Sequence, residues 1–360
     1  MTQIYTILFD LDGTLVNTAP DLMAAHNHVM KKFGHAEKEM SEIKSLAGKG
    51  AWVMMQRSFK EEIKDEKTKK EMTKEFIDYY AKNIDQNSKP LKGTIKFLDW
   101  AKNKNISMGV CTNKQERLAV DLLKKLDMNK YFDQPIVILG GFLIDGSAYN
   151  EMTEYIKSRI NNKVVIVPVN KIEWLTTNWT FGWKNILDKV EKIVTELSKE
   201  SSTNKVTLIG HSSGGMILRL YLSDLLFSRK IYNGKDYANC LITLGTPNQA
   251  KRATYLRNFV SSKLPGSFYS ADVSYISVAG ELDLNGPIAT KTSLKLSKSS
   301  YRALNGNRDV IGDGLVPRDS ALLIGSKQVV IKETAHGKAF GKNWYGSKNK
   351  VEEWLSRLSE

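Results

Sequence analysis

One strand-turn-helix segment constrains this chain more than any other part of its sequence. The apolar run at residues 206–209 leads directly into the hexapeptide GHSSGG, and a second apolar stretch, residues 216–226, follows with helical spacing. A Gly-x-Ser-x-Gly sequence between a buried strand and a helix places its serine in a tight, strained turn. Gly210 and Gly214 allow strand and helix to approach closely. The segment predicts an exposed nucleophile, Ser212; the simpler alternative is a glycine-rich turn with a helix-capping serine.

A nucleophilic serine needs a neighbouring base, and few histidines are available for that role. Of the five histidines, three lie in the N-terminal third, and His211 lies inside the serine turn, which directs it away from Ser212. His336 follows the predicted strand at residues 328–331. Because loops after parallel strands gather at one edge of a sheet, His336 is expected on the same side as Ser212.

The histidine in turn needs a carboxylate to orient it. Asp313 lies in a turn-rich loop before His336, and Asp283 follows another predicted strand. Either residue gives the chain order serine, acid, histidine that α/β hydrolases use. We favour Asp313 and keep Asp283 as the alternative; Asp319 and Glu333 are more distant options.

From residue 135 onward, short apolar runs alternate with helical patterns. This alternation predicts a mostly parallel sheet covered by helices on both faces. Strands are expected at residues 136–139, 164–167, 206–209, 241–244, 273–278 and 328–331, and helices at 148–160, 183–197, 216–226 and 351–358.

Residues 135–360 resemble lipases and esterases of the α/β-hydrolase superfamily, notably in LGTP at residues 244–247 and DGLVP at residues 313–317. The resemblance implies an oxyanion hole formed by the backbone N–H groups of Phe142 and Ser213. Glycine at position 140, where the commonest lipases have histidine, departs from that pattern. The resemblance implies a serine hydrolase for carboxylic esters, lipid esters included, that uses Ser212, His336 and Asp313 and needs no cofactor.

The N-terminal third begins with a different pattern. An apolar strand, residues 4–9, ends in Asp10-Leu-Asp12 before a glycine turn. Carboxylates two residues apart at a strand end face the same mouth of a sheet. One then suits the role of nucleophile or metal ligand, and the other that of proton donor. A second strand, residues 106–112, ends in TNK.

This third resembles the phosphoglycolate-phosphatase branch of the haloacid-dehalogenase superfamily. The resemblance implies Asp10 as phosphoryl nucleophile, Asp12 as general acid/base, and magnesium bound by both. It implies a phosphate held at Thr112 and Asn113, and a helical cap over about residues 19–87.

The resemblance ends near Asp133, because the family's later lysine and acidic motif are not found in order. Without them, a phosphate beside two carboxylates is repelled by about 4 kcal/mol for each close charge pair. We therefore expect two domains: residues 1–134, an incomplete phosphatase-like sheet with a helical cap, and 135–360, the hydrolase sheet. The first is expected to be inactive. A magnesium-dependent phosphomonoester phosphatase and a non-catalytic fusion are the alternative functions.

Composition limits the remaining possibilities. The formal charge is +14, but basic residues are mixed with acidic ones, and no basic run is interleaved with aromatic residues. We therefore expect no nucleic-acid partner. The apolar runs are too short for a membrane span, although contact with a membrane surface is left open. Two cysteines form no disulfide framework or metal motif, and no signal peptide is recognised, which favours the cytoplasm. The expected partner is a small-molecule or lipid ester substrate.

Overall fold

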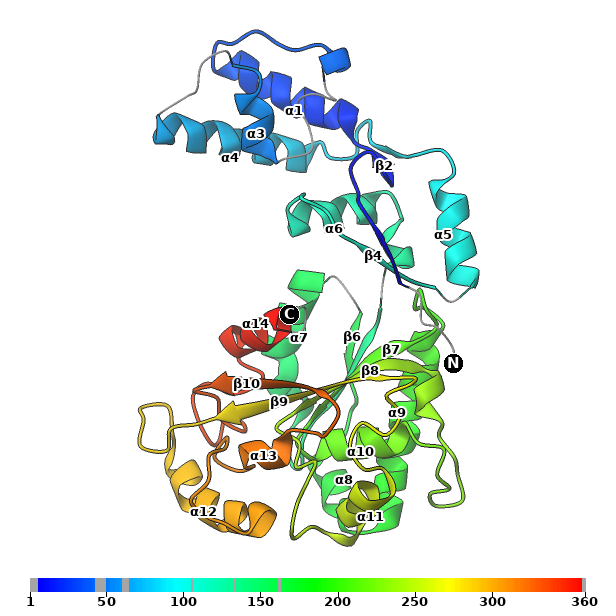
Figure 1. Ribbon diagram of the computed structural model, residues 1–360, viewed down its shortest axis with the longest axis vertical. Coiled ribbons are helices and arrows are strands. Elements are labelled where there is room, and N and C mark those ends of the chain that lie inside the picture. Colours follow the sequence, from blue (N-terminus) through cyan, green and yellow to red (C-terminus); the bar gives the residue numbers. More distant parts are fainter. Residues whose placement is uncertain are drawn as a thin grey trace. The chain divides into compact units, whose positions relative to one another are not determined.

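The chain separates into two compact units, residues 1–133 and 134–360, in the computed structural model (Figure 1). Each unit contains parallel strands and helices, so the predicted two-domain α/β class is confirmed. Residues 4, 5, 133 and 358, which belong to predicted elements or to the predicted junction, lie outside the described residues. The structure describes residues 6–42, 50–59, 65–104, 106–132, 134–160 and 163–357.

The N-terminal unit combines short strands with a group of helices. Its elements are β1 (Thr6–Phe9), β2 (Val16–Asn17), α1 (Ala19–Lys32), η1 (Met40–Glu42), α3 (Ala51–Gln56), α4 (Glu66–Lys82), β3 (Lys89–Pro90), α5 (Thr94–Asn103), β4 (Ser107–Val110), α6 (Glu116–Lys125) and η2 (Asn129–Tyr131).

Two small sheets organise this unit. Strands β1 and β4 pair in parallel, and the described residues supply no further strand to that sheet. Leu8 on β1 is largely exposed. In the chain, β2 precedes and β3 follows the helices α1, α3 and α4. The two strands pair antiparallel and so close this helical insertion at its base. Because β1 and β4 are parallel, their carboxyl ends present Asp10 and Thr112 at the same edge of the sheet.

The C-terminal unit alternates strands with helices along its whole length. Its elements are β5 (Ile136–Leu139), η3 (Gly146–Tyr149), α7 (Asn150–Ile160), β6 (Val164–Ile166), α8 (Lys171–Leu175), η4 (Thr176–Asn178), α9 (Thr180–Ser198), β7 (Val206–His211), α10 (Ser213–Tyr221), η5 (Gly234–Asp236), β8 (Ala238–Leu244), α11 (Tyr255–Lys263), β9 (Ser274–Glu281), α12 (Lys291–Asn305), α13 (Arg318–Ala321), β10 (Lys327–Lys332) and α14 (Lys348–Ser356).

The six strands formed by the described residues of this unit join one parallel sheet in the order β10-β9-β8-β7-β5-β6. The chain first moves from β5 outward to β6, then returns to the other side of β5 and continues from β7 to β10. The direction of winding therefore reverses between β5 and β7. In open parallel sheets, ligands bind beyond the carboxyl ends of the strands at such a reversal.

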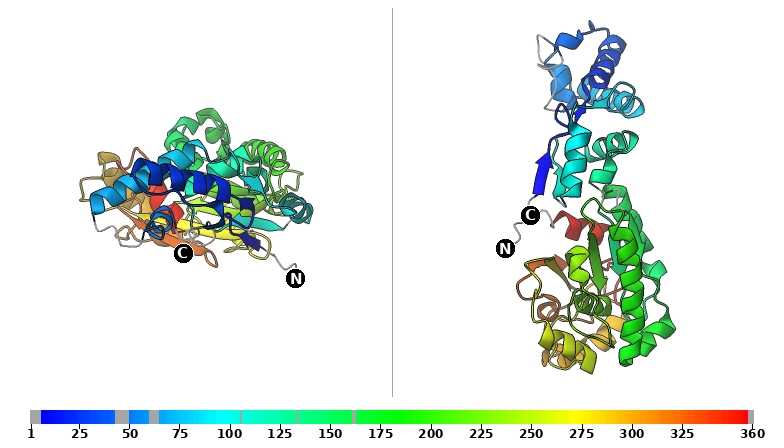
Figure 2. Two further views of the ribbon diagram at one scale, coloured as in Figure 1. Left: turned by 90° about the horizontal axis from the view of Figure 1, so that it is seen from above. Right: turned by 90° about the vertical axis from the view of Figure 1, so that its right-hand side faces the viewer.

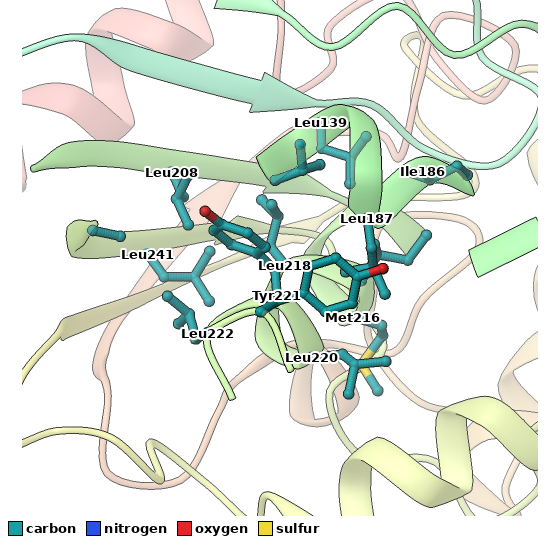
Figure 3. Close-up of a cluster of buried hydrophobic side chains, with 14 of the residues drawn as sticks. Leu139, Ile186, Leu187, Leu208, Met216, Leu218, Leu220, Tyr221, Leu222 and Leu241 are labelled. Carbon is teal, nitrogen blue, oxygen red and sulfur yellow. The ribbon is translucent and has the colours of Figure 1, made fainter. Parts of the chain in front are cut away.

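Strand alternation divides the core between the two faces of this sheet. Val137 and Leu139 pack with α9 and α10 on one face, whereas Ile136 and Ile138 pack with α7 and α14 on the other. Figure 2 shows the long helix α9 from two further sides. Figure 3 shows the first face, where leucines of β5, β7 and β8 meet side chains of α9 and α10, Tyr221 among them. This two-sided burial fixes the strand ends that carry the site.

Several predicted bounds differ from those of the structure, and the largest difference is in the helix after the serine turn. The helix expected over residues 216–226 ends at Tyr221. Leu226 beyond it is exposed, so the apolar pattern there does not belong to a buried helical face. Within the described residues, no helix is both long enough and apolar enough to cross a bilayer.

Candidate active site

Ser212 lies in the turn that joins β7 to α10. Its φ is 52°, a conformation that few non-glycine residues adopt, and its N–H donates to the carbonyl of Leu244 at 2.9 Å. A Cβ atom on Gly210 would collide with the backbone of Gly215, and one on Gly214 would collide with the carbonyl oxygens of Leu139 and Gly140 at the end of β5. These glycines therefore permit the close strand-helix packing that holds the serine in its strained turn.

Three predicted site residues come together at this edge of the sheet. His336 Nε2 lies 2.9 Å from Ser212 Oγ, and His336 Nδ1 lies 2.9 Å from Asp313 Oδ2. Asp313 is fully buried, and His336 and Ser212 are nearly so. The alternative acid, Asp283, instead accepts a hydrogen bond from the N–H of Asn285 at 2.9 Å. The geometry thus places Asp313, and not Asp283, beside the histidine.

The carboxylate of Asp313 is held by donors on both oxygens. Oδ1 accepts the N–H groups of Leu315 at 3.0 Å and Val316 at 2.7 Å. Oδ2 accepts the Tyr345 hydroxyl at 2.9 Å in addition to His336. Burial, with the nearby Asp313 charge, raises the pKa of Tyr345 well above its usual value, so its hydroxyl stays a donor. Sequence reasoning missed Tyr345, which carries no local motif.

His211 belongs to a second hydrogen-bonded chain behind the serine. Its Nε2 donates to the carbonyl of His336 at 2.8 Å, so its Nδ1 accepts the Tyr149 hydroxyl at 2.8 Å. The Tyr149 oxygen in turn accepts the N–H of Gly141 at 2.8 Å. Burial, with the nearby His336 as a smaller cause, lowers the pKa of His211 well below 6.5. A neutral His211 therefore ties the loop after β5 to the histidine loop.

The predicted oxyanion donors flank Ser212. Phe142 follows β5 and Ser213 begins α10, the two elements on either side of the winding reversal. Ser213 is the first helical residue, so its N–H has no carbonyl one turn earlier in the helix to bond. In the described part of the chain, the Phe142 N–H donates to no backbone carbonyl. The N–H of Gly141 differs, because it donates to the Tyr149 hydroxyl.

The residues predicted for phosphate chemistry line a separate cavity of about 320 Å³ in the N-terminal unit. Asp10, Asp12, Thr112 and Asn113 all reach it. Lys114 Nζ lies 3.1 Å from Asp12 Oδ1 and donates to the Tyr80 hydroxyl at 2.9 Å. Burial lowers the pKa of Lys114, and the charge of Asp12 opposes that shift. A lysine from the second motif thus lies against the carboxylates.

This donor set does not fit a magnesium ion. Asp12 Oδ1 already accepts the Thr18 hydroxyl at 2.7 Å and pairs with the ammonium group of Lys114, which supplies a positive charge beside this carboxylate. Asp10 Oδ1 accepts the N–H of Leu11 at 2.8 Å. Among the residues that the structure describes, no three His, Cys, Asp or Glu side chains gather as metal ligands.

The parallel six-stranded sheet and the serine turn after β7 are features of the α/β-hydrolase class. Comparison with protein families agrees: residues 135–279 match the palmitoyl protein thioesterase family model, and residues 7–142 match that of haloacid dehalogenase-like hydrolases. Both resemblances inferred from the sequence are thereby confirmed. Because both are hydrolase families, the matches support an enzyme.

Known proteins resemble the N-terminal part. A phosphoglycolate phosphatase of Agrobacterium fabrum is 40% identical over 127 residues, which are 35% of this chain and 54% of that protein. Phosphoglycolate phosphatase 1 of Pseudomonas aeruginosa is 31% identical over 130 residues, 35% of this chain and 47% of the relative. The chain thus spans about half the length of these curated relatives.

A solved structure of a predicted phosphoglycolate phosphatase from Haemophilus somnus was also found. It covers 68% of this chain and 86% of its own, at 18% identity and a TM-score of 0.34. A likeness of that degree defines neither the fold nor the function.

Proposed function

We propose that the C-terminal unit is a serine hydrolase that cleaves carboxylic esters or thioesters through an acyl-enzyme. The observation that carries this proposal is the continuous contact from Ser212 Oγ through His336 to Asp313, with both separations 2.9 Å. The match to the palmitoyl protein thioesterase family supports acyl transfer as the reaction class.

The proposed reaction begins at Ser212. Its Oγ attacks the acyl carbonyl while His336 Nε2 takes the hydroxyl proton, and buried Asp313 stabilises the imidazolium that forms. The negative charge on the former carbonyl oxygen is bound by the N–H groups of Phe142 and Ser213. Such a donor typically contributes about 10²–10³ to turnover.

Collapse of this intermediate breaks the bond to the alcohol or thiol. His336 returns the proton to the leaving group, and the acyl chain stays on Ser212 as an ester. Water, deprotonated by His336, then attacks the acyl-enzyme and releases the carboxylic acid. Each cycle consumes one water and regenerates the free serine.

Turnover of simple acyl substrates tests the proposal. The full chain is expected to hydrolyse 4-nitrophenyl esters and the matching aryl thioesters, with turnover lost in Ser212→Ala and His336→Ala. Ser270→Ala and His35→Ala are matched controls, because both residues are exposed and far from Ser212 in sequence. Equal turnover in Ser212→Ala and the unmodified protein would overturn the proposal.

The N-terminal unit supports a second candidate, a phosphomonoester phosphatase, through its similarity to phosphoglycolate phosphatases. The contact between Lys114 and Asp12 argues against that activity, because the carboxylate that would serve as general acid/base is already paired with an ammonium group. We expect no magnesium-dependent release of phosphate from 2-phosphoglycolate. Release that is abolished by Asp10→Asn and unaffected by Ser212→Ala would instead establish the phosphatase.

A further inference from the structure

A cavity of about 190 Å³ opens beside the serine turn. Its lining includes Phe142 and Ser213, the two residues whose N–H groups we assign to the oxyanion. Neither Ser212 nor His336, which must protonate the leaving group, is part of the lining. Because the cavity adjoins the two assigned oxyanion residues, we assign it to the acyl side of the scissile bond.

The size and walls of this cavity limit what it can hold. A cavity of about 150 Å³ accommodates benzene, so this one has room for an acyl portion of about six to eight non-hydrogen atoms. Trp174, Trp183 and Ile217 supply apolar walls. The Trp183 indole N–H is already bonded to the carbonyl of Thr177 at 3.0 Å. These walls suit a short methylene chain.

One wall of the cavity carries a charge. Arg257 on α11 is partly buried and donates from Nη2 to Ser213 Oγ at 2.8 Å. In the described part of the chain no carboxylate lies within ion-pair distance of it. Burial lowers the pKa of Arg257, yet a guanidinium remains charged at neutral pH. Charges withdrawn from water are normally paired, but this partly buried guanidinium has no counter-ion among the described residues.

A neighbouring arginine shows the contrast. Arg219 on α10 is fully enclosed, and its guanidinium donates to the carbonyl oxygens of Asn248 and Leu264 and to the Asn248 side chain. Its donors thus serve to join α10 to the segments around α11. Within the residues that the structure describes, Arg257 has one hydrogen-bond partner, the Ser213 hydroxyl, and it lines a cavity. That arrangement is expected of a group that binds a ligand.

We propose that Arg257 determines specificity by binding a carboxylate at the far end of a short acyl chain. This inference rests on the proposed serine hydrolase and names its substrate class, the half-esters or half-thioesters of short dicarboxylic acids. A guanidinium presents two parallel N–H groups that match a carboxylate, which fixes the chain's direction as well as its charge. The carbonyl at the other end then meets Ser212.

Two esters that differ only at the acyl terminus test this assignment. They are 4-nitrophenyl hexanoate and the mono-4-nitrophenyl ester of adipic acid, which replaces the terminal methyl with a carboxylate. The unmodified protein is expected to show a kcat/KM about ten- to a hundredfold higher for the adipate ester. Arg257→Gln should abolish that preference, whereas Arg252→Gln, at an exposed position of the same segment, should preserve the preference and leave hexanoate turnover within about twofold.

Three results separate the possible failures. Equal rates for both esters, or a preference that survives Arg257→Gln, would overturn the role of Arg257. A hexanoate ester of a carboxylated nitrophenol places the charge on the leaving group; an Arg257-dependent preference for that ester would overturn the acyl placement. If neither ester is cleaved and a fluorophosphonate leaves Ser212 unlabelled, the hydrolase proposal falls and this inference falls with it. Labelling of Ser212 in Arg257→Gln confirms that the variant retains a folded site.

Discussion

The Tyr345 hydroxyl donates to Asp313 Oδ2 across 2.9 Å in a fully buried setting. The same tyrosine oxygen accepts the N–H of Gly280 at 2.6 Å, so the carboxylate is anchored to the end of β9. Since Oδ2 also faces His336, the tyrosine fixes which carboxylate oxygen meets the imidazole. We describe Tyr345 as a positioning residue because it acts on the serine only through Asp313 and His336.

Replacing Tyr345 with phenylalanine removes one donor to the buried carboxylate and leaves the Gly280 N–H without an acceptor. We expect kcat to fall by about tenfold with little change in KM, because a hydrogen bond to a charged group contributes about 1.5–3 kcal/mol. Steady-state kinetics with an aryl ester measures both constants. Tyr237→Phe, at an exposed tyrosine of the same unit, is the control. An unchanged kcat would show that Asp313 needs no support from Tyr345.

Tyr149→Phe breaks the link between the Gly141 N–H and His211. The loop that carries Phe142 then loses its anchor, so the oxyanion donor is held less firmly. We expect kcat to fall by about five- to twentyfold while KM changes by less than about twofold, because one neutral hydrogen bond contributes about 1 kcal/mol. A rise in KM at constant kcat would contradict a role in positioning the oxyanion loop.

The lowered pKa of the buried His211 makes the stability of the C-terminal unit depend on pH. Its pKa in the folded unit lies well below 6.5, so below pH 6.5 the unfolded chain binds a proton that the folded chain does not. Stability contributed by neutral His211 is therefore complete above pH 6.5 and declines as the pH falls, by about 1.4 kcal/mol per unit. Hydrogen exchange of β7 amides between pH 5 and 7.5 measures this slope. In His211→Gln the dependence of stability on pH should be shallower by about 1.4 kcal/mol per pH unit, which is the contribution of one proton. An identical slope would contradict the assignment.

We expect Asp21 to stabilise the helical insertion in the N-terminal unit. This buried carboxylate accepts the N–H groups of Asn87 at 3.0 Å and Ser88 at 2.8 Å, and thereby ties α1 to the chain entering β3. Asp21→Asn replaces one accepting oxygen with an NH₂ group that faces N–H donors. We therefore expect a loss of about 1–3 kcal/mol in unfolding free energy. Asp78→Asn, in an exposed pair with Lys74, should cost less than about 1 kcal/mol. Hydrogen exchange of α1 amides compares them, and equal losses would contradict the role of Asp21.

The sheet of the C-terminal unit could be predicted because its strands are buried on both faces. Runs such as residues 136–139 and 206–209 are continuously apolar, which is the signature of a parallel sheet covered by helices. Because the loops after such strands gather at one edge, Ser212 and His336 could be placed together before their separation was known. The choice between Asp313 and Asp283 depended on tertiary geometry that no local pattern encodes.

Other features were beyond sequence reasoning for specific physical reasons. Helix α12 is rich in serine and lysine and carries few apolar residues, so its pattern did not predict a helix. Tyr149 and Tyr345 are separated in sequence from their partners, and only the fold brings them beside His211 and Asp313. The contact between Lys114 and Asp12 likewise depends on the fold. Lys114 follows β4, and only the folded unit brings its side chain beside Asp12 and beside Tyr80 of α4.

The most direct test of the central claim is covalent labelling of the serine. The full chain is incubated with a fluorophosphonate and digested, and the modified peptide is identified by mass spectrometry. We predict an adduct on Ser212 that disappears in His336→Ala and persists in His35→Ala. Folded protein that carries no adduct, or carries it on another serine, would contradict an activated nucleophile at Ser212.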